Sequence, residues 1–194
     1  MSFLDKIAAS IMPAASDEDR AQARAEATRL AHGHDWLAQV LDHHRQIEGL
    51  FEAALNASGS QARVAAAKEL GALLTAHSAA EEAVLYPAVI EHSGKTSGTM
   101  AYEEQAMAKV QLAMLEKLDP MSQEWRDKLE HIQGAVQQHV YQEEHSWFPE
   151  VIEATPADER GRLSSRYQEE FTRCNAGKAP TWKGEAAPAT AQVV

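Results

Sequence analysis

Four long stretches between residues 33 and 152 repeat apolar residues at intervals of three and four, and this periodicity restricts the fold more than any other feature of the chain. Such spacing places the apolar residues on one face of an α-helix, which then packs against a shared core. Short segments separate the stretches, so consecutive helices are expected to run antiparallel. The sequence therefore predicts an all-α protein built on an up-down-up-down four-helix bundle. The predicted stripes are Leu37, Val40, Leu41, His44, Ile47, Phe51 and Leu55; Val64, Ala67, Leu70, Leu74, His77, Glu81 and Val84; Ala101, Gln105, Ala108, Leu112 and Leu115; and Leu129, Ile132, Val136, His139, Glu143 and Trp147.

An N-terminal helical extension, residues 1–32, is predicted to precede the bundle at 33–152. Its first part has apolar residues at helical spacing and is expected to form a short amphipathic helix that ends before Pro13. A second helix is expected to begin after Ser16 and to end near Leu30. Ser16 is a favourable helix cap, and the acidic residues that follow it complement the positive end of the helix dipole.

A further helix is predicted on the C-terminal side of the bundle, within residues 153–175. Thr155 is expected to cap this helix, and Pro156 suits the first helical position, where its missing N–H has no partner to lose. Residues 176–194 are rich in Gly, Pro and Ala and show no periodicity. They are predicted to form a disordered tail.

The charge balance narrows the classes of partner. The 194 residues include 18 Lys and Arg against 29 Asp and Glu, a formal net charge of −11. This acidity disfavours nucleic acid and anionic membrane surfaces, both of which attract basic proteins. A single cysteine, Cys174, excludes an internal disulfide and a thiolate metal cage, and it favours the reducing cytoplasm. No apolar run is long enough to predict a membrane span, and the N-terminus lacks the pattern of a signal peptide.

An eleven-residue pattern occurs twice. The segment HSAAEEAVLYP, which begins at His77, returns as HVYQEEHSWFP, which begins at His139, and both follow H-x3-E-E-x3-(Y/F)-P. The copies lie on the second and fourth predicted helices, which sit diagonally across the bundle. Because four residues span about one helical turn, His77 shares a face with Glu81, and His139 with Glu143. Facing inward, the two pairs would surround one volume with two imidazoles and two carboxylates.

A metal ion is the expected occupant of this volume. Buried carboxylates cost several kcal/mol each unless they are paired or bind a cation, and the inner faces carry almost no basic residue. Imidazole and carboxylate without thiolate fit iron, manganese or zinc, and two bridging carboxylates favour a dinuclear centre. His44, followed by Glu48, adds a third H-x3-E on the first helix. One such spacing is common by chance, but three on core-facing stripes are not. Glu48 itself is either a ligand, a proton-handling residue or a salt-bridged flank.

Residues beside these positions are expected to contribute less directly. His43 is turned about 100° from the inward face of its helix and is a ligand only if that helix is rotated. Glu82 and Glu144 are expected to be solvated or to contact the ligands from outside. Tyr86 and Phe148, each followed by proline, are expected to close their helices beneath the site.

These segments resemble the hemerythrin-like family with its HHE cation-binding domain. The resemblance covers about residues 35–152 and rests on LDHHRQIEGLF, AHSAAEEAVLYP and QHVYQEEHSWFP. It implies a non-haem centre of two iron ions, joined by an oxo or hydroxo bridge, with an open position for O2 or a related small molecule. Both glutamates of the pattern would bridge the irons. The family's ligands carry over to His44, His77, Glu81, His139 and Glu143.

One position departs from the family pattern. The family usually supplies a further His from the third helix, and Gln105 stands where that His is expected. Gln is a weak neutral ligand, so Glu104 or Tyr102 on the same turn would have to offer an oxygen instead. An anionic oxygen stabilises ferric iron and lowers the redox potential. The departure therefore argues against a reversible oxygen store and favours sensing or redox turnover.

The resemblance implies a protein that binds O2, NO or peroxide at iron, in sensing or in a response to oxidative or nitrosative stress. Glu48 or Tyr102 would supply a proton, and the protein would be a monomer or a homodimer without nucleic-acid or membrane partners. Two alternatives are kept. The first is a diiron enzyme that reduces peroxide or nitric oxide, or that donates iron for the repair of iron–sulfur clusters. The second is a helical interaction module whose metal site has decayed.

Overall fold

The computed structural model describes residues 15–31 and 35–175. Every regular element within these ranges is helical, which confirms the prediction of an all-α bundle with additional helices. The helix predicted before Pro13 and the tail predicted at 176–194 lie outside the described residues. Among the described helices, none combines the length with the apolar composition that crossing a bilayer requires.

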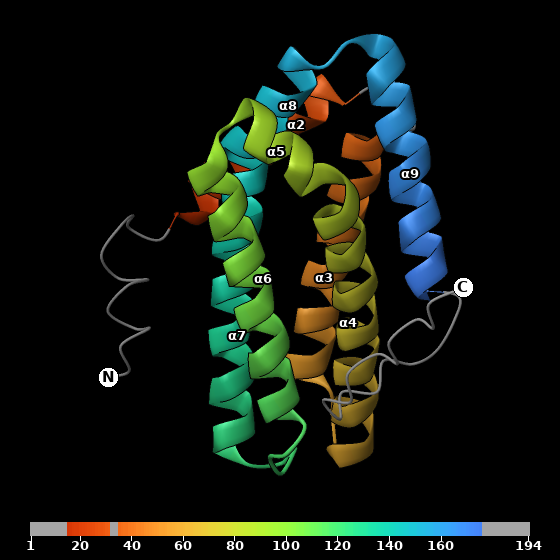
Figure 1. Cartoon of the computed structure of the whole chain (residues 1–194). Coiled ribbons are helices and arrows are strands. Elements are labelled where there is room, and N and C mark those ends of the chain that lie inside the picture. The colour runs from red at the N-terminus through yellow and green to blue at the C-terminus, as the bar shows by residue number, and fades with distance from the viewer. Residues whose placement is uncertain (1–14, 32–34, 176–194) are drawn as a thin grey trace, which may run out of the picture.

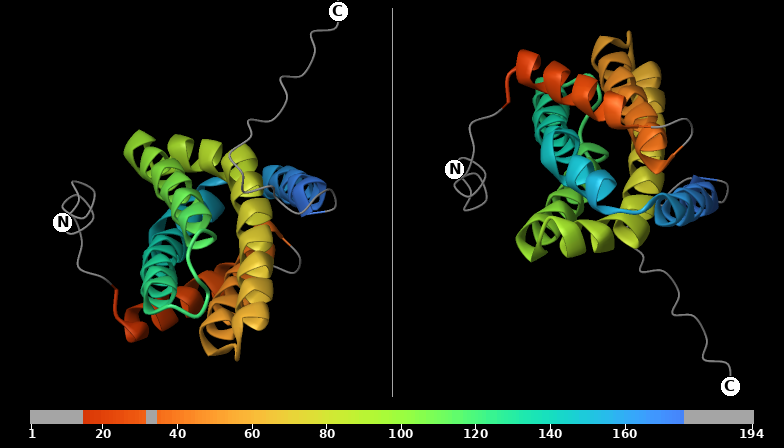
Figure 2. Two further views of the ribbon diagram at one scale, coloured as in Figure 1. Left: turned by 90° about the horizontal axis from the view of Figure 1, so that it is seen from below. Right: turned by 90° about the horizontal axis from the view of Figure 1, so that it is seen from above.

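Four long helices form the bundle, and they run alternately up and down (Figure 1). The views along the bundle show the four helices arranged around one core (Figure 2). The pairs α3–α4, α6–α7 and α3–α7 pack closely, whereas α4 and α6 touch at fewer points. The diagonal placement predicted for the second and fourth helices is therefore present. The bundle helices are α3 (Trp36–Asn56), α4 (Ser60–Ala80), α6 (Lys95–Leu115) and α7 (Gln123–Gln142).

The second and fourth bundle helices each continue through one π-helical turn into a short α-helix. In both cases the π turn begins at the first Glu of the repeated pattern, and proline is the second residue of the short helix that follows. Proline lacks an N–H and crowds the carbonyl four residues before it, so the wider π turn accommodates it better than an α turn would. The first continuation is η1 (Glu81–Leu85) and α5 (Tyr86–His92), and the second is η2 (Glu143–Trp147) and α8 (Phe148–Ala154).

Local sequence sets the starts of the bundle helices. The side chain of Asp35 accepts a hydrogen bond from a backbone N–H in the first turn of α3, and Ser122 does the same for α7. Such caps satisfy N–H groups that have no partner within the helix. Gly59 and Gly94 precede α4 and α6 with φ values of 87° and 94°, a backbone conformation that favours glycine.

Two helices pack outside the bundle. They are α2 (Asp17–Leu30), which begins with a capping box between Ser16 and Asp19 as its sequence predicts, and α9 (Ala157–Asn175). α2 lies across η2 and α3, whereas α9 runs antiparallel along α4 and also contacts η1 and α3 (Figures 1 and 2). Both therefore reach the end of the bundle that carries the π turns.

The hydrophobic core consists of two clusters with a polar layer between them. One cluster lies towards α5 and α8 and includes Leu41, and the other lies towards the opposite end and includes Ile47. His44, buried on α3 between these two residues, belongs to the polar layer. The antiparallel α4 shows the same layers in reverse order along the chain, since His77 follows Leu74 of the second cluster and precedes Ala80 of the first. The predicted site residues thus lie where the apolar stripes are interrupted.

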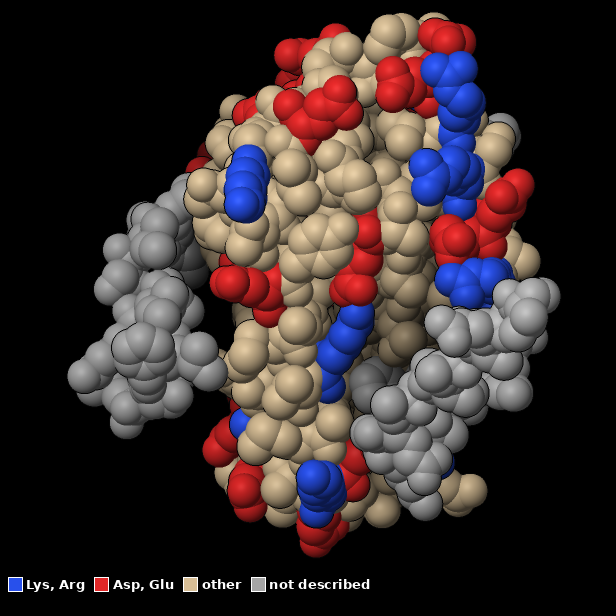
Figure 3. All heavy atoms as spheres, viewed as in Figure 1, with Lys and Arg blue, Asp and Glu red and all other residues tan. Residues whose placement is uncertain are grey.

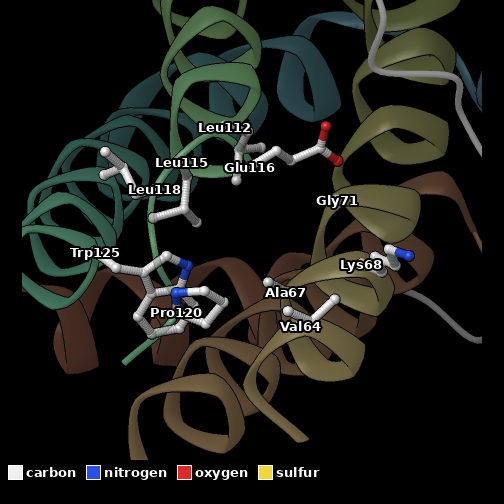
Figure 4. A pocket seen from close by; sticks show the side chains of 10 residues that line it. All are labelled: Val64, Ala67, Lys68, Gly71, Leu112, Leu115, Glu116, Leu118, Pro120 and Trp125. Carbon is white, nitrogen blue, oxygen red and sulfur yellow. The ribbon is translucent and has the colours of Figure 1, made fainter. Parts of the chain in front are cut away.

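A groove of about 320 Å³ opens between α4 and α6 at the end of the bundle far from the π turns (Figure 4). Leu112, Leu115 and Trp125 supply much of its apolar lining, with Lys68 and Glu116 at its edge. No predicted site residue lines this groove. The candidate site is instead the closed polar layer.

The contact between α5 and α6 gives a test of the packing near the π turns. A Cβ added at Gly98 would lie 2.2 Å from Cγ1 of Ile90. We therefore expect Gly98→Ala to lower the free energy of unfolding by about 1–3 kcal/mol, measured by urea denaturation, because one side chain has to move. Adding Ile90→Ala should recover most of this loss. Gly134→Ala, at which a Cβ meets nothing within 4 Å, is the control, and equal stabilities of the two Gly→Ala variants would contradict the packing.

Candidate metal centre

Three imidazoles from three bundle helices turn their Nε2 atoms towards two glutamates in the polar layer. His44 Nε2 lies 3.2 Å from Glu143 Oε2, on the side of the site nearest α3. His77 Nε2 lies 3.2 Å from Glu81 Oε2, four residues later in the chain. His139 Nε2 lies 3.3 Å from Glu143 Oε1. The structure therefore brings together all five residues that the sequence analysis names as ligands, and none is more than 8% exposed.

Inward-facing atoms of this group lack hydrogen-bond partners. His44 Nε2, Glu81 Oε1 and Glu143 Oε2 are buried without any. Leaving such an atom unpaired costs about 1–3 kcal/mol, and more for a charged group. One ligand atom from each of these three residues and from His77 falls within 4.8 Å of the others. A cation at their centre would satisfy every unpaired atom, and imidazole with carboxylate is a donor set that iron, manganese and zinc accept.

The electrostatics of the site also favour a cation. Burial and the neighbouring Glu143 raise the pKa of Glu81 well above its ordinary value. Burial opposes protonation of His44, but the adjacent carboxylates of Glu143 and Glu144 outweigh it and raise the pKa of His44 to about 9. Burial also opposes ionisation of Glu143, yet the pKa of Glu143 is lowered, mainly by His139. Without a metal, protons therefore provide the positive charge that the two carboxylates need, and a cation would replace them.

Tyr86 enters the site beside His139. Its hydroxyl donates to Glu143 Oε1 at 3.0 Å and lies 3.0 Å from His139 Nε2 and 3.4 Å from Glu81 Oε2. The side chain is fully buried. Glu143 thus directs one oxygen towards His44 and the other towards His139 and Tyr86. The two oxygens of this carboxylate therefore face different histidines.

The π turn brings Tyr86 into the site, whereas a regular helix predicts it beneath the site. In an α-helix, a residue five positions after Glu81 is rotated by about 140° from it. In η1 the N–H of Tyr86 instead bonds to the carbonyl of Glu81, so the two residues stack one π turn apart on the same face. The sequence feature that marks both π turns is the pair of glutamates followed five residues later by proline. Helical periodicity alone predicts a regular α-helix through both segments.

Each inward-facing imidazole is held from behind through its Nδ1. Two of the partners are carboxylates, and the third is a phenol. Such contacts fix the ring and its tautomer, leaving Nε2 free to bind a metal. The three contacts join His44 to Glu144 Oε1 at 2.7 Å, His77 to the Tyr167 hydroxyl at 3.1 Å and His139 to Glu104 Oε2 at 2.8 Å.

The third bundle helix supports the site without presenting a nitrogen ligand to it. Gln105, at the position where the family pattern expects His, is buried and donates from Nε2 to Glu81 Oε2 at 2.6 Å. Glu104, which the sequence analysis offers as a replacement ligand, bonds to Nδ1 of His139 on the outer side of that ring. α6 therefore orients one carboxylate and one imidazole.

The other two additional candidates are engaged elsewhere. The hydroxyl of Tyr102 donates to the backbone carbonyl of Glu82 at 2.7 Å. Both carboxylate oxygens of Glu48 accept from Arg24, at 2.7 and 2.9 Å, and its side chain is 38% exposed. Of the three roles considered for Glu48, the structure supports the third, in which Glu48 forms a salt bridge beside the site. Glu82 pairs with Lys109 at the surface, whereas Glu144 is buried against His44.

Imidazoles and carboxylates that converge in the closed layer of a four-helix bundle define a helical cation-binding protein. Comparison of the sequence with known families agrees, because the profile described as the hemerythrin HHE cation binding domain matches residues 35–151. The chain belongs to this family, and the resemblance drawn from the repeated motif is confirmed.

Comparison with individual proteins adds one characterised relative. A protein named DNA nickase from Nostoc sp. (strain PCC 7120) is 34% identical over 107 residues. The aligned region covers 55% of this chain and 28% of the relative, so the chain spans little more than a quarter of that protein. No solved structure matches the sequence.

Proposed function

We propose that this chain is a non-haem diiron protein that binds O2, NO or peroxide, in sensing or in a response to oxidative or nitrosative stress. Glu143, with one oxygen towards His44 and the other towards His139 and Tyr86, is the observation that carries the proposal of two ions. The family match supports cation binding more generally.

Two overlapping donor sets would hold the irons. The first consists of His44 and His77, and the second of His139 and Tyr86, with carboxylates of Glu81 and Glu143 available to both. When bound, iron supplies an open coordination position and a reversible change of oxidation state. Gln105, which keeps its amide on Glu81, leaves the second set with fewer nitrogen donors than the family pattern provides.

The surrounding residues select small ligands. The two hydrophobic clusters cover the polar layer from both ends, and the five central side chains are almost inaccessible to water. Burial and the neighbouring Glu143 raise the pKa of Tyr86, so its hydroxyl keeps its proton when no cation is bound and donates it to Glu143 Oε1. A diatomic molecule or peroxide fits such a site far better than a larger organic substrate.

Reduction of peroxide or nitric oxide is the second candidate function. The buried hydroxyl of Tyr86 favours it, because this group places a proton donor within the site itself. In the first function Tyr86 would only hold a metal or orient a ligand. Turnover with added peroxide distinguishes the two.

DNA nicking, the activity in the relative's name, is not proposed for this chain. The net charge is −11. On the face shown in Figure 3, basic side chains gather along α9, but acidic side chains lie beside them. We therefore propose a protein without a nucleic-acid partner, and its single cysteine supports a place in the reducing cytoplasm. Incubation of the metal-loaded protein with supercoiled plasmid tests this, and open-circular product would contradict it.

The proposal of a diiron site is tested by metal content and absorption. Protein purified anaerobically without a metal-binding tag is expected to contain two irons per chain by elemental analysis. Its absorption spectrum should change when O2, NO or azide is added. Protein that takes up no iron, or whose loaded spectrum is insensitive to all three ligands, would contradict the function. A single iron per chain would contradict the dinuclear site alone.

A further inference from the structure

Two side chains from outside the family's domain reach the metal centre, one through a supporting carboxylate and the other by direct contact with a predicted ligand. The family profile begins at residue 35 and ends at residue 151. Arg24 of α2 lies before that segment, and Tyr167 of α9 lies after it. Arg24 is linked to His44 by two hydrogen bonds through Glu144, and Tyr167 is linked to His77 by one. Both helices lie outside the segment that the family profile matches.

Arg24 holds the carboxylate behind His44. Its Nε lies 3.0 and 2.9 Å from the two oxygens of Glu144, and its terminal nitrogens bind both oxygens of Glu48. Glu144 is only 2% exposed, so its charge needs a counterion. A guanidinium supplies that charge and also fixes the carboxylate plane through its fork of donors. Glu144 Oε1 is thereby held 2.7 Å from His44 Nδ1.

Tyr167 holds the imidazole of His77. Its hydroxyl lies between His77 Nδ1, at 3.1 Å, and His43 Nδ1, at 2.9 Å. A His77 ring that binds metal through Nε2 carries its proton on Nδ1 and donates it to the phenol oxygen. The phenol then donates its own proton to Nδ1 of His43. This chain of donors runs in one direction only, so it fixes the tautomers of both rings.

α9 also explains why His43 is not in the metal-binding layer. The ring of His43 stacks on Phe171, with centroids 4.0 Å apart, and lies over Tyr167 at 5.8 Å. Tyr167 is fully buried by these contacts. His43 therefore ends the hydrogen-bond chain that starts at His77, and the packing of two aromatic residues of α9 keeps that chain in place.

We propose that α2 and α9 complete the metal centre: Arg24 positions His44 through Glu144, and Tyr167 positions His77 directly. Both are positioning residues, since neither reaches the inward-facing atoms. The partners differ in kind, because His44 has a carboxylate behind it and His77 a neutral phenol. His44 is therefore the stronger donor of the two, and its orientation depends on α2, whereas that of His77 depends on α9. This inference rests on the proposed cation binding.

The test measures zinc affinity in the full-length protein by competition with a chelator. Tyr167→Phe removes only a hydroxyl, and Arg24→Gln removes the charge and most of the fork. Each is expected to weaken zinc binding about 10-fold or more, as loss of such supporting contacts typically does. Arg24→Lys, which keeps the charge without the fork, should recover part of the loss. Tyr141→Phe and Arg29→Gln are the controls, because Tyr141 stacks on His145 and Arg29 pairs with Glu26, neither of which is a predicted ligand.

A second measurement reports on the hydrogen bonds themselves. In zinc-loaded wild-type protein, nitrogen-15 NMR should show His77 with zinc on Nε2 and a slowly exchanging proton on Nδ1. In Tyr167→Phe that proton should exchange faster, while the signals of His139 stay unchanged. This readout does not follow a general loss of stability. A wild-type spectrum in which His77 binds zinc through Nδ1 would contradict the contact of that nitrogen with Tyr167, even if a variant does not fold.

The possible outcomes separate this inference from the proposed function. If wild-type protein binds no zinc or iron, cation binding itself fails. If wild-type protein binds metal and both Tyr167→Phe and Arg24→Gln retain its affinity and its histidine signals, the role of α2 and α9 is overturned while cation binding stands. Equal losses in the control variants would also overturn it, since they would reflect stability alone.

Discussion

Glu81→Gln is expected to abolish stoichiometric metal binding, whereas Glu82→Gln at the next position is expected to leave it unchanged. Glu81 is fully buried, with an unpaired Oε1 towards His44. Glu82 points away from the site and pairs with Lys109. The loss in Glu81→Gln should exceed the roughly 10–100-fold that follows removal of a supporting contact. Metal content and zinc titration measure both variants.

The metal-free proteins provide the control for folding. Burial raises the pKa of Glu81, so its carboxyl is protonated when no cation is bound, and the neutral amide of Gln imitates that state. The metal-free Glu81→Gln variant should therefore still fold, with its free energy of unfolding lowered by no more than about 0.5–3 kcal/mol, the range of most single substitutions. Glu81→Gln that keeps full affinity for metal would refute the placement of this carboxylate at the centre of the site.

The second copy of the motif should respond differently to the same pair of changes. Glu143→Gln removes an inward-facing carboxylate, as Glu81→Gln does. Glu144, unlike Glu82, is buried and bonds to Nδ1 of His44. Glu144→Gln is therefore expected to weaken binding about 10–100-fold rather than to have no effect. The sequences of the two copies show no reason for this difference, because it depends on which neighbouring helix each second Glu faces.

The apolar periodicity was sufficient to locate the bundle and its inward layer. His44, His77 and His139 interrupt apolar stripes, and in a helix such positions necessarily face the core, so their convergence follows from spacing alone. The same spacing does not predict that Arg24 and Tyr167 contact the site. Tyr167 contacts His43 from 124 positions away in the chain, and Arg24 contacts Glu144 from 120. Such contacts depend on how α2 and α9 pack, and helical periodicity carries no information about that packing.

The aromatic position just before the proline of the repeated motif creates the main asymmetry of the site. The first copy has Tyr86 there, and the second has Phe148. Both stand one π turn after the first Glu of their copy. The hydroxyl of Tyr86 reaches Glu143 and His139, whereas Phe148 packs edge-on against Trp36 in the hydrophobic cluster, with ring centroids 5.3 Å apart. One pattern thus supplies a donor in its first copy and core packing in its second.

Tyr86→Phe gives the first copy the residue type that the second copy already has, and we expect it to reduce the iron content from two per chain to one. His139 would lose its neighbouring oxygen donor, while His44 and His77 would keep both carboxylates. The ferric wild-type protein should also show a visible charge-transfer absorption band from phenolate to iron, which Tyr86→Phe should lack.

Tyr102→Phe is the matched control. The ring of Tyr102 lies edge-on to that of Tyr86, with centroids 5.0 Å apart, but its hydroxyl bonds to the carbonyl of Glu82. Two irons and an unchanged spectrum in Tyr86→Phe would exclude this tyrosine as a ligand, because the remaining side chains would then hold the second ion without it.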